Sequence, residues 1–192
     1  EGKENLVIRG FDMDKSILSF SGQTDGAQGL SITNCKNIVL EKFTVQDSKG
    51  DAIKVQYVDG IVFRSVKTEW TGGPKPTNGA YGLYPVQCTN VLIEYSVAIG
   101  ASDAGIYVGQ SNDIIVRHST AYHNVAGIEI ENSFNALVYA NHTYDNTGGI
   151  LVFDLPDLVQ KKGGNIRVYH NIVRNNNLDN FAPPGNIVSK VL

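Results

Sequence analysis

Acidic and aromatic residues in the middle of the chain are of types that could act on a carbohydrate. Glu129 and Glu131 are separated by a single residue. On a β-strand such residues share one face at a spacing of about 6.7 Å, near the short end of the carboxyl separation in inverting glycosidases. Lys54, Tyr107 and Asp103 are further candidates for acid, base or charge-neutralising roles. The five residues form our predicted catalytic set, although surface glutamate pairs on strands are also common without any catalytic role.

A second group of side chains has the properties of a sugar-binding surface. Aromatic rings stack against the C–H faces of sugars, while amides, carboxylates and imidazoles exchange hydrogen bonds with hydroxyls. The predicted substrate-binding residues are Trp70, Tyr81, Tyr84, Gln110, His123 and Asp154. No resident metal or other cofactor is predicted, and a calcium ion held by Asp103 and Glu129 stays open as an alternative.

The elements that position these residues follow from an internal repeat. Units of the type Gly-Ile-x-Val begin at Gly105, Gly127 and Gly149, and related units begin at Gly29 and Ala52. Their regular spacing gives a period of about 22–23 residues. Soon after each unit comes a second apolar motif that begins with a residue tolerant of positive φ, namely Asn37, Gly60, Asn90, Asp113 or Asn135. With a third, weaker segment that closes each repeat, the pattern predicts an all-β solenoid with three short strands per coil, stacked about 4.8 Å apart.

The same motifs resemble the right-handed parallel β-helix repeat superfamily. The run from Tyr81 to Asp154 resembles an uncharacterised group of bacterial envelope proteins with tandem β-helix repeats. The resemblance implies a right-handed, single-stranded parallel β-helix with about 22–23 residues per coil. It also implies an extracellular, periplasmic or cell-envelope location, with the export signal outside this chain. Because the superfamily includes lyases, epimerases, hydrolases and inert fibres, it does not decide among them.

We expect residues 1–192 to form one domain and to be a portion of a longer solenoid, because neither end carries an evident capping helix. Two insertions interrupt the repeat, near 72–78 and 155–164. They are expected to flank the same outer face of the first strand in each coil, one on each side. By analogy with β-helix enzymes that act on polysaccharides, the groove between them is the predicted site.

Two outward columns are expected on the second strand of each coil. One column should form a ladder of alternating charge: Glu41, Arg64, Glu94, Arg117 and Tyr139. The other is an apolar stripe, which we expect a partner protein, a second copy or a segment outside this chain to cover: Val39, Val62, Leu92, Ile115 and Leu137. Cys35 and Cys88 are expected about 9.6 Å apart, too far for a disulfide, and therefore free.

Charge and hydropathy exclude two classes of partner. The chain has 16 basic and 19 acidic residues, a net charge of -3, which argues against binding nucleic acid or an anionic membrane surface. No apolar run reaches the roughly 20 residues of a membrane span. Two hypotheses remain. The first is an exported β-helix that binds a polysaccharide and, if it is an enzyme, acts as a polysaccharide lyase, epimerase or glycoside hydrolase. The alternative is a non-catalytic envelope or fibre scaffold that binds other proteins.

Overall fold

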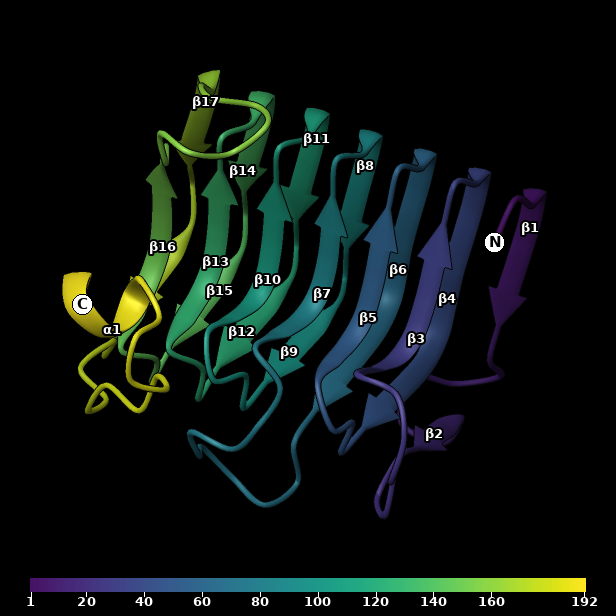
Figure 1. The fold of residues 1–192 in the computed structure, drawn as a ribbon, viewed down its shortest axis with the longest axis horizontal. Helices are drawn as coiled ribbons and strands as arrows, with labels where there is room; N and C mark the ends of the chain where they lie inside the picture. The colour runs from purple at the N-terminus through teal and green to yellow at the C-terminus, as the bar shows by residue number, and fades with distance from the viewer.

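The computed structural model describes residues 1–192, except for the side chain of Val191. It is a right-handed parallel β-helix whose coils stack along one axis (Figure 1). One face is a six-stranded parallel sheet, here called the first sheet. Its strands, in order along the axis, are β3 (Gln28–Thr33), β5 (Asp51–Gln56), β7 (Tyr81–Val86), β10 (Ala104–Gly109), β13 (Ala126–Glu131) and β16 (Gly148–Phe153).

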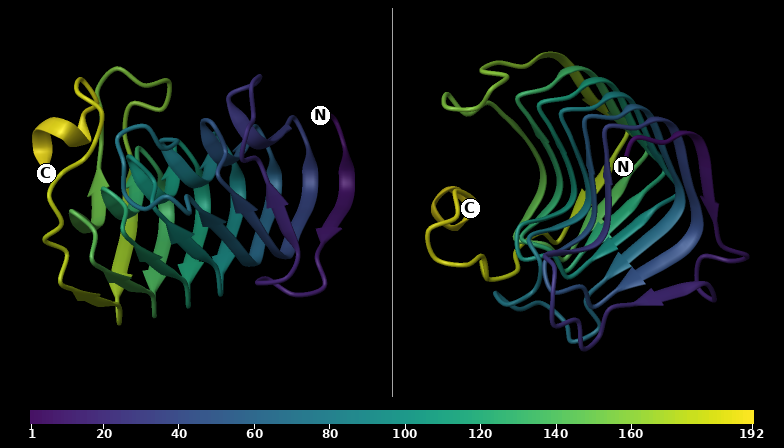
Figure 2. Two further views of the ribbon diagram at one scale, coloured as in Figure 1. Left: turned by 90° about the horizontal axis from the view of Figure 1, so that it is seen from below. Right: turned by 45° about the vertical axis from the view of Figure 1, so that its right-hand side comes forward.

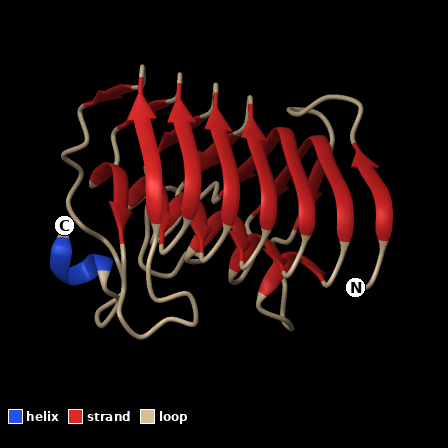
Figure 3. Cartoon of the chain, turned by 90° about the horizontal axis from the view of Figure 1, so that it is seen from above, coloured by secondary structure: helices blue, strands red, loops and turns tan.

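The second and third strands of the coils form one continuous twelve-stranded sheet, here called the second sheet. It bends around a corner of the solenoid, and the long strands β4 (Lys36–Gln46) and β6 (Asp59–Glu69) pass round that corner without a break (Figure 3). The strands before the corner are β1 (Glu4–Arg9), β8 (Thr89–Glu94), β11 (Asn112–Arg117), β14 (Phe134–Tyr139) and β17 (Gly164–Tyr169). The strands after it are β2 (Ile17–Ser19), β9 (Val97–Ile99), β12 (Thr120–Tyr122), β15 (His142–Tyr144) and β18 (Ile172–Arg174).

Strand pairing follows the register predicted from the repeat. Ala104 pairs with Ala126, and Gln28 pairs with Asp51, so each strand residue lies beside its equivalent in the next coil. The inward positions of the first sheet fill the core, and among them Ile53 is completely buried. The predicted bends are confirmed too, because the residues that begin the second motif have positive φ, from 52° at Asn37 to 82° at Gly60.

The charge ladder lies on the second sheet as predicted. Arg64 contacts Glu41 at 3.6 Å and Glu94 at 2.7 Å, and Arg117 contacts Glu94 at 2.6 Å. Arg9 extends the ladder by pairing with Glu41. Burial of Glu94 opposes its ionisation, but hydrogen bonds from Arg64 and Arg117 outweigh that effect and keep the pKa of Glu94 below its ordinary value. The charged residues on this face therefore have a structural role, because they pair neighbouring coils.

The cysteines and the apolar stripe also lie where the register places them. Cys35 and Cys88 are buried and free, which confirms the prediction of two unpaired thiols. Val62, Leu92 and Ile115 face outward in successive coils and are half-buried by their neighbours. No helix among the described residues is long and apolar enough to cross a membrane.

The C-terminal segment departs from the coils. After β18 it turns back across the outer face of the first sheet and ends in the single-turn helix α1 (Val188–Val191), as the right panel of Figure 2 shows. The insertion after β16 lies above the same face (Figure 1). Asn132 fixes this insertion: its side chain donates to the carbonyl oxygens of Leu155 at 2.8 Å and Gln160 at 2.7 Å, and accepts from the amide of Leu155 at 2.7 Å.

Candidate functional site

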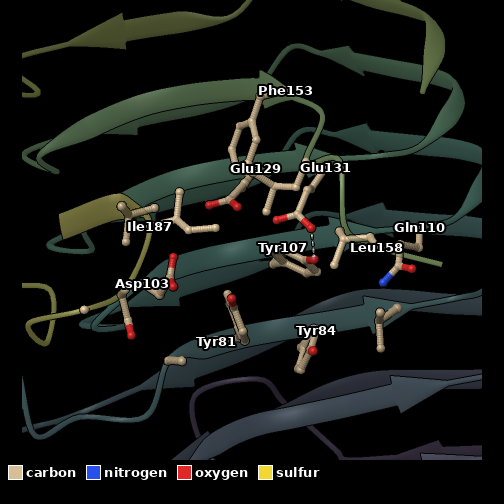
Figure 4. A pocket seen from close by; sticks show the side chains of 16 residues that line it. Tyr81, Tyr84, Asp103, Tyr107, Gln110, Glu129, Glu131, Phe153, Leu158 and Ile187 are labelled. Atoms are coloured by element: carbon tan, nitrogen blue, oxygen red, sulfur yellow. Dashed lines mark hydrogen bonds between the residues drawn. The ribbon is translucent and has the colours of Figure 1, made fainter. Parts of the chain in front are cut away.

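A cleft of about 490 Å³ lies over the outward face of β7, β10 and β13 (Figure 4). The strands contribute its floor, and segments from elsewhere in the chain form its walls. The lining residues are Ala80, Tyr81, Tyr84, Val86, Asp103, Tyr107, Gln110, Glu129, Glu131, Phe153, Leu155, Leu158 and Gly185 to Val188. The predicted groove therefore exists over the first sheet, and it contains seven of the eleven predicted site residues.

Three tyrosines form a contiguous cluster on the floor. The ring centroid of Tyr81 lies 4.4 Å from that of Tyr84 and 4.6 Å from that of Tyr107, and the rings of Tyr84 and Tyr107 are 5.1 Å apart. They come from the outward positions of two neighbouring strands, β7 and β10. This tyrosine cluster gives the cleft a broad aromatic surface beside its acidic groups.

Gly109 positions one of these tyrosines. The Tyr107 ring lies along its own strand over Gly109, and its hydroxyl donates to Glu131 Oε1 at 3.1 Å. A β-carbon at position 109 would lie 2.1 Å from the Tyr107 hydroxyl oxygen, so any larger residue would displace the ring. The glycine therefore makes the Tyr107–Glu131 contact possible. Sequence reasoning missed this role, although Gly109 interrupts a column that otherwise holds side chains, and that was the available signal.

Glu129 is the most buried acid in the cleft. Its side chain points into the cleft beside Asp103 and Glu131 (Figure 4), only 2 % of the residue is exposed, and its Oε2 atom has no hydrogen-bond partner among the described residues. Burial, reinforced by the negative charges of Asp103 and Glu131, raises the pKa of Glu129 well above its ordinary value. Glu129 therefore keeps its proton to a higher pH than an exposed glutamate does.

Glu131 and Asp103 differ from Glu129 in their surroundings. Burial also raises the pKa of Glu131, but the hydrogen bond from Tyr107 opposes that rise. Burial raises the pKa of Asp103 to about 7, against an opposing effect of the Tyr81 hydroxyl. Asp103 Oδ1 also lacks a hydrogen-bond partner in the described part of the chain. The cleft thus holds carboxyls with unequal proton affinities, an arrangement that separates an acid from a base.

The prediction that both insertions wall the cleft was wrong for one of them. Leu155 and Leu158, from the insertion near 155–164, form one wall as expected. The opposite wall is formed by Gly185 to Val188 of the C-terminal segment, not by the insertion near 72–78. That insertion instead packs near the turn at Gly100, to whose carbonyl Asn78 donates at 2.6 Å. The apolar pair Ile187 and Val188, in a stretch otherwise rich in Pro, Gly and Asn, was the only sequence signal for the true wall.

Four predicted site residues lie outside the cleft. Trp70 belongs to the core, where 5 % of it is exposed and its indole N–H donates to the Ser48 carbonyl at 2.8 Å. Trp70 therefore does not line the cleft. His123 packs edge-on against Tyr122, away from the cleft, and Asp154 lines a separate hollow next to β17. Lys54 lies beside the cleft, with its ammonium group 5.3 Å from the centroid of the Tyr84 ring.

Among the described residues, no group of three or more His, Cys, Asp and Glu side chains is arranged to hold a metal ion. Asp103 and Glu129, the pair considered for calcium, lack a third ligand of this kind. The chemistry available from the described side chains is proton transfer and hydrogen bonding next to aromatic rings.

Comparison with known proteins agrees with the fold. A family model described as a right-handed beta helix region matches residues 75–186, which is more than half of the 192 residues. No curated protein sequence matches the chain. The matched region includes β7, β10 and β13, the strands that carry the floor of the cleft.

Proposed function

The chain belongs to the family of right-handed β-helix proteins, and from that premise we propose that its cleft binds a polysaccharide and hydrolyses it. The observation that carries this proposal is the buried Glu129, whose pKa burial raises, beside Glu131 on the same face of one strand. Glycosidases use a carboxylic acid of raised pKa to protonate the departing sugar oxygen and a second carboxylate on the other side of the scissile bond.

Each residue has a definite role in this proposal. Glu129 donates the proton to the leaving oxygen as the glycosidic bond breaks, and Glu131, oriented by Tyr107, takes a proton from the water that attacks the anomeric carbon. The tyrosine cluster binds the faces of the sugar rings. Leu155 and Leu158 on one side and Ile187 on the other limit the width available to the chain. The proposed substrate is a polysaccharide of the cell envelope or the surroundings, so export of this protein belongs to the same proposal.

The cleft favours hydrolysis over elimination or epimerisation. Those two reactions take a proton next to a uronate carboxylate and need a cation or acid to neutralise that carboxylate. None of the lining residues is basic, and Lys54 is engaged with Tyr84 at the edge. A uronate would therefore enter next to three acidic side chains without a compensating positive charge.

The experiment is a panel of soluble polysaccharides assayed for new reducing ends and for the ultraviolet absorbance of an unsaturated uronate. We expect reducing ends without the absorbance that elimination produces. Glu129→Gln and Glu131→Gln should each lower the rate by about 10²–10⁴-fold while binding is kept, because each removes one proton-transfer group. Asp25→Asn, which makes the same charge change on an exposed loop, is the matched control. A rise in that absorbance would refute hydrolysis, and full activity in Glu129→Gln would refute the assigned acid.

A non-catalytic scaffold is the second candidate, and the apolar stripe supports it. Leu92, Ile115 and Leu137 line a shallow hollow of about 430 Å³ on the second sheet, which is the sheet that does not carry the cleft. An apolar surface of this kind is typical of contacts with another protein. If every glycan in the panel is neither bound nor cut, the scaffold becomes the better account of the molecule.

A further inference from the structure

The cleft combines three acidic side chains with no basic one. Asp103, Glu129 and Glu131 line the cleft. The ammonium group of Lys54 lies outside the cleft, over the Tyr84 ring. We propose that the sugar bound here carries a positively charged amine, as a deacetylated amino sugar does. This inference rests on the proposed function and names the class of substrate.

The unpaired carboxyl oxygens are the first argument. Asp103 Oδ1 and Glu129 Oε2 are buried without a hydrogen-bond partner among the described residues. Buried polar atoms are nearly always paired, so two unpaired acceptors in one cleft indicate a ligand that supplies donors. An ammonium group offers three donors and no acceptor, whereas a carboxylate offers none. Of the charged groups that sugars carry, the amine alone complements this pair.

The aromatic surface is the second argument. The faces of tyrosine rings attract cations, and Tyr81, Tyr84 and Tyr107 lie together next to the acids. The Lys54 ammonium at the edge of the cleft already uses the Tyr84 ring in this way. A metal cation is the weaker candidate, because the described side chains form no three-ligand group.

The proposal predicts that binding releases protons. Asp103 is faced by Tyr81 from β7 and by Glu131 from β13, with Asp51 from β5 nearby, and none of these groups supplies positive charge. Glu129 is faced by Asp103 and Glu131. Burial raises the pKa of Asp103 to about 7, and an arriving ammonium group favours its ionised form, while Glu129 keeps the proton that it donates to the leaving oxygen. Affinity should therefore rise with pH until Asp103 is fully ionised, as long as the ligand amine stays protonated.

Isothermal titration calorimetry with oligosaccharides of equal length tests this directly. The probes are a β-1,4 glucosamine oligomer, its N-acetylated form, a β-1,4 glucose oligomer and an oligogalacturonate. The glucosamine and glucose oligomers differ only in the amine, so their affinity ratio isolates its contribution. We expect at least tenfold tighter binding of the glucosamine oligomer, no binding of the uronate, and heats that vary with the ionisation enthalpy of the buffer because protons are released.

Variants decide whether the cleft causes the preference. Asp103→Asn should reduce it to below threefold, while Asp25→Asn keeps it. A preference unchanged in Asp103→Asn, equally weakened in Asp25→Asn, or abolished by EDTA would overturn the inference. Equal or tighter binding of the glucose oligomer would refute the proposal that the bound sugar carries an amine, while the proposed polysaccharide function would stand. Failure of all four probes, together with silence in the polysaccharide panel, would overturn both.

Discussion

Asp103 and Glu129 lie on adjacent coils with carboxyl oxygens that no described donor reaches. Their proton affinities come from position, because the same residue types on the outer surface of a coil would be hydrated and ionised at neutral pH. The neighbouring Glu131 has the Tyr107 hydroxyl as a donor and keeps more of its acidity. At the scale of single residues, burial and hydrogen bonding therefore divide three similar acids into different roles.

Stability should fall as pH rises because of these acids. The pKa of Asp103 moves from an ordinary 3.8 to about 7 on folding. Its favourable contribution is complete below about pH 4 and is lost as pH rises through about 7, because the unfolded chain ionises first. Asp103→Asn should remove this part of the slope, worth at most about 4 kcal/mol at pH 8. Urea unfolding from pH 4.5 to 8 measures it, with Asp25→Asn as control. Parallel curves for wild type and Asp103→Asn would contradict the assignment.

Secondary-structure elements bring the walls of the cleft into place through the residues at their ends. Asn132 follows β13 directly, is completely buried, and ties the insertion after β16 to the coil before it. On the other side Val188, at the start of α1, is 2 % exposed and anchors the C-terminal segment over the first sheet. The β-strands supply the floor, but the width of the cleft depends on these two attachments.

Removing the Asn132 side chain should release the insertion. Asn132 has a φ of 43°, so glycine is the substitution that deletes its contacts without straining the backbone. We expect Asn132→Gly to cost about 2–4 kcal/mol of unfolding free energy, since buried partners lose their hydrogen bonds. Hydrogen exchange of residues 155–160 should accelerate most. Asn135→Gly, at an exposed bend with a φ of 56°, is the matched control. Equal exchange in both variants would show that other contacts hold the insertion.

The whole molecule presents two unlike faces. The first sheet carries an acidic, aromatic cleft with walls, and the second sheet carries the charge ladder next to the apolar stripe. The charged side chains of the ladder pair with one another along the axis. The side chains of the apolar stripe have only the neighbouring coils of the same chain beside them. A solenoid in which every coil adds one residue to each column extends any such property over its length. Association through the second sheet would leave the cleft accessible.

The stripe predicts association that two lysines should abolish. Leu92→Lys with Ile115→Lys places two charges in the middle of the stripe, where neither residue is in the core. We expect the wild type to sediment as more than a monomer, and the double variant to sediment as a folded monomer with an unchanged β-type circular dichroism spectrum. Ser31→Lys with Thr33→Lys on the first sheet is the control and should leave association unchanged. A monomeric wild type would exclude self-association through this surface.

The fold was predictable from the sequence because its determinants are local and periodic. Alternation along each strand and a regular repeat set which side chains face inward, and Asn, Gly or Asp at each bend supplied the positive φ. The same periodicity predicted the charge ladder, the two free cysteines and the outward positions of Tyr84, Tyr107, Glu129 and Glu131. Residues in the regular coils could therefore be placed by counting.

The tertiary structure decided everything that depends on segments outside the repeat. Trp70 follows β6 directly and was predicted to contact a ligand, yet packing against the neighbouring coil buries it. The C-terminal wall at Gly185 to Val188 has no periodic relation to the strands that it covers, so counting could not place it. The raised pKa values of Asp103 and Glu129 follow from their burial and from the carboxyls beside them, which counting along the repeat does not give. The sequence thus determined the floor of the cleft, and long-range packing determined its walls and its chemistry.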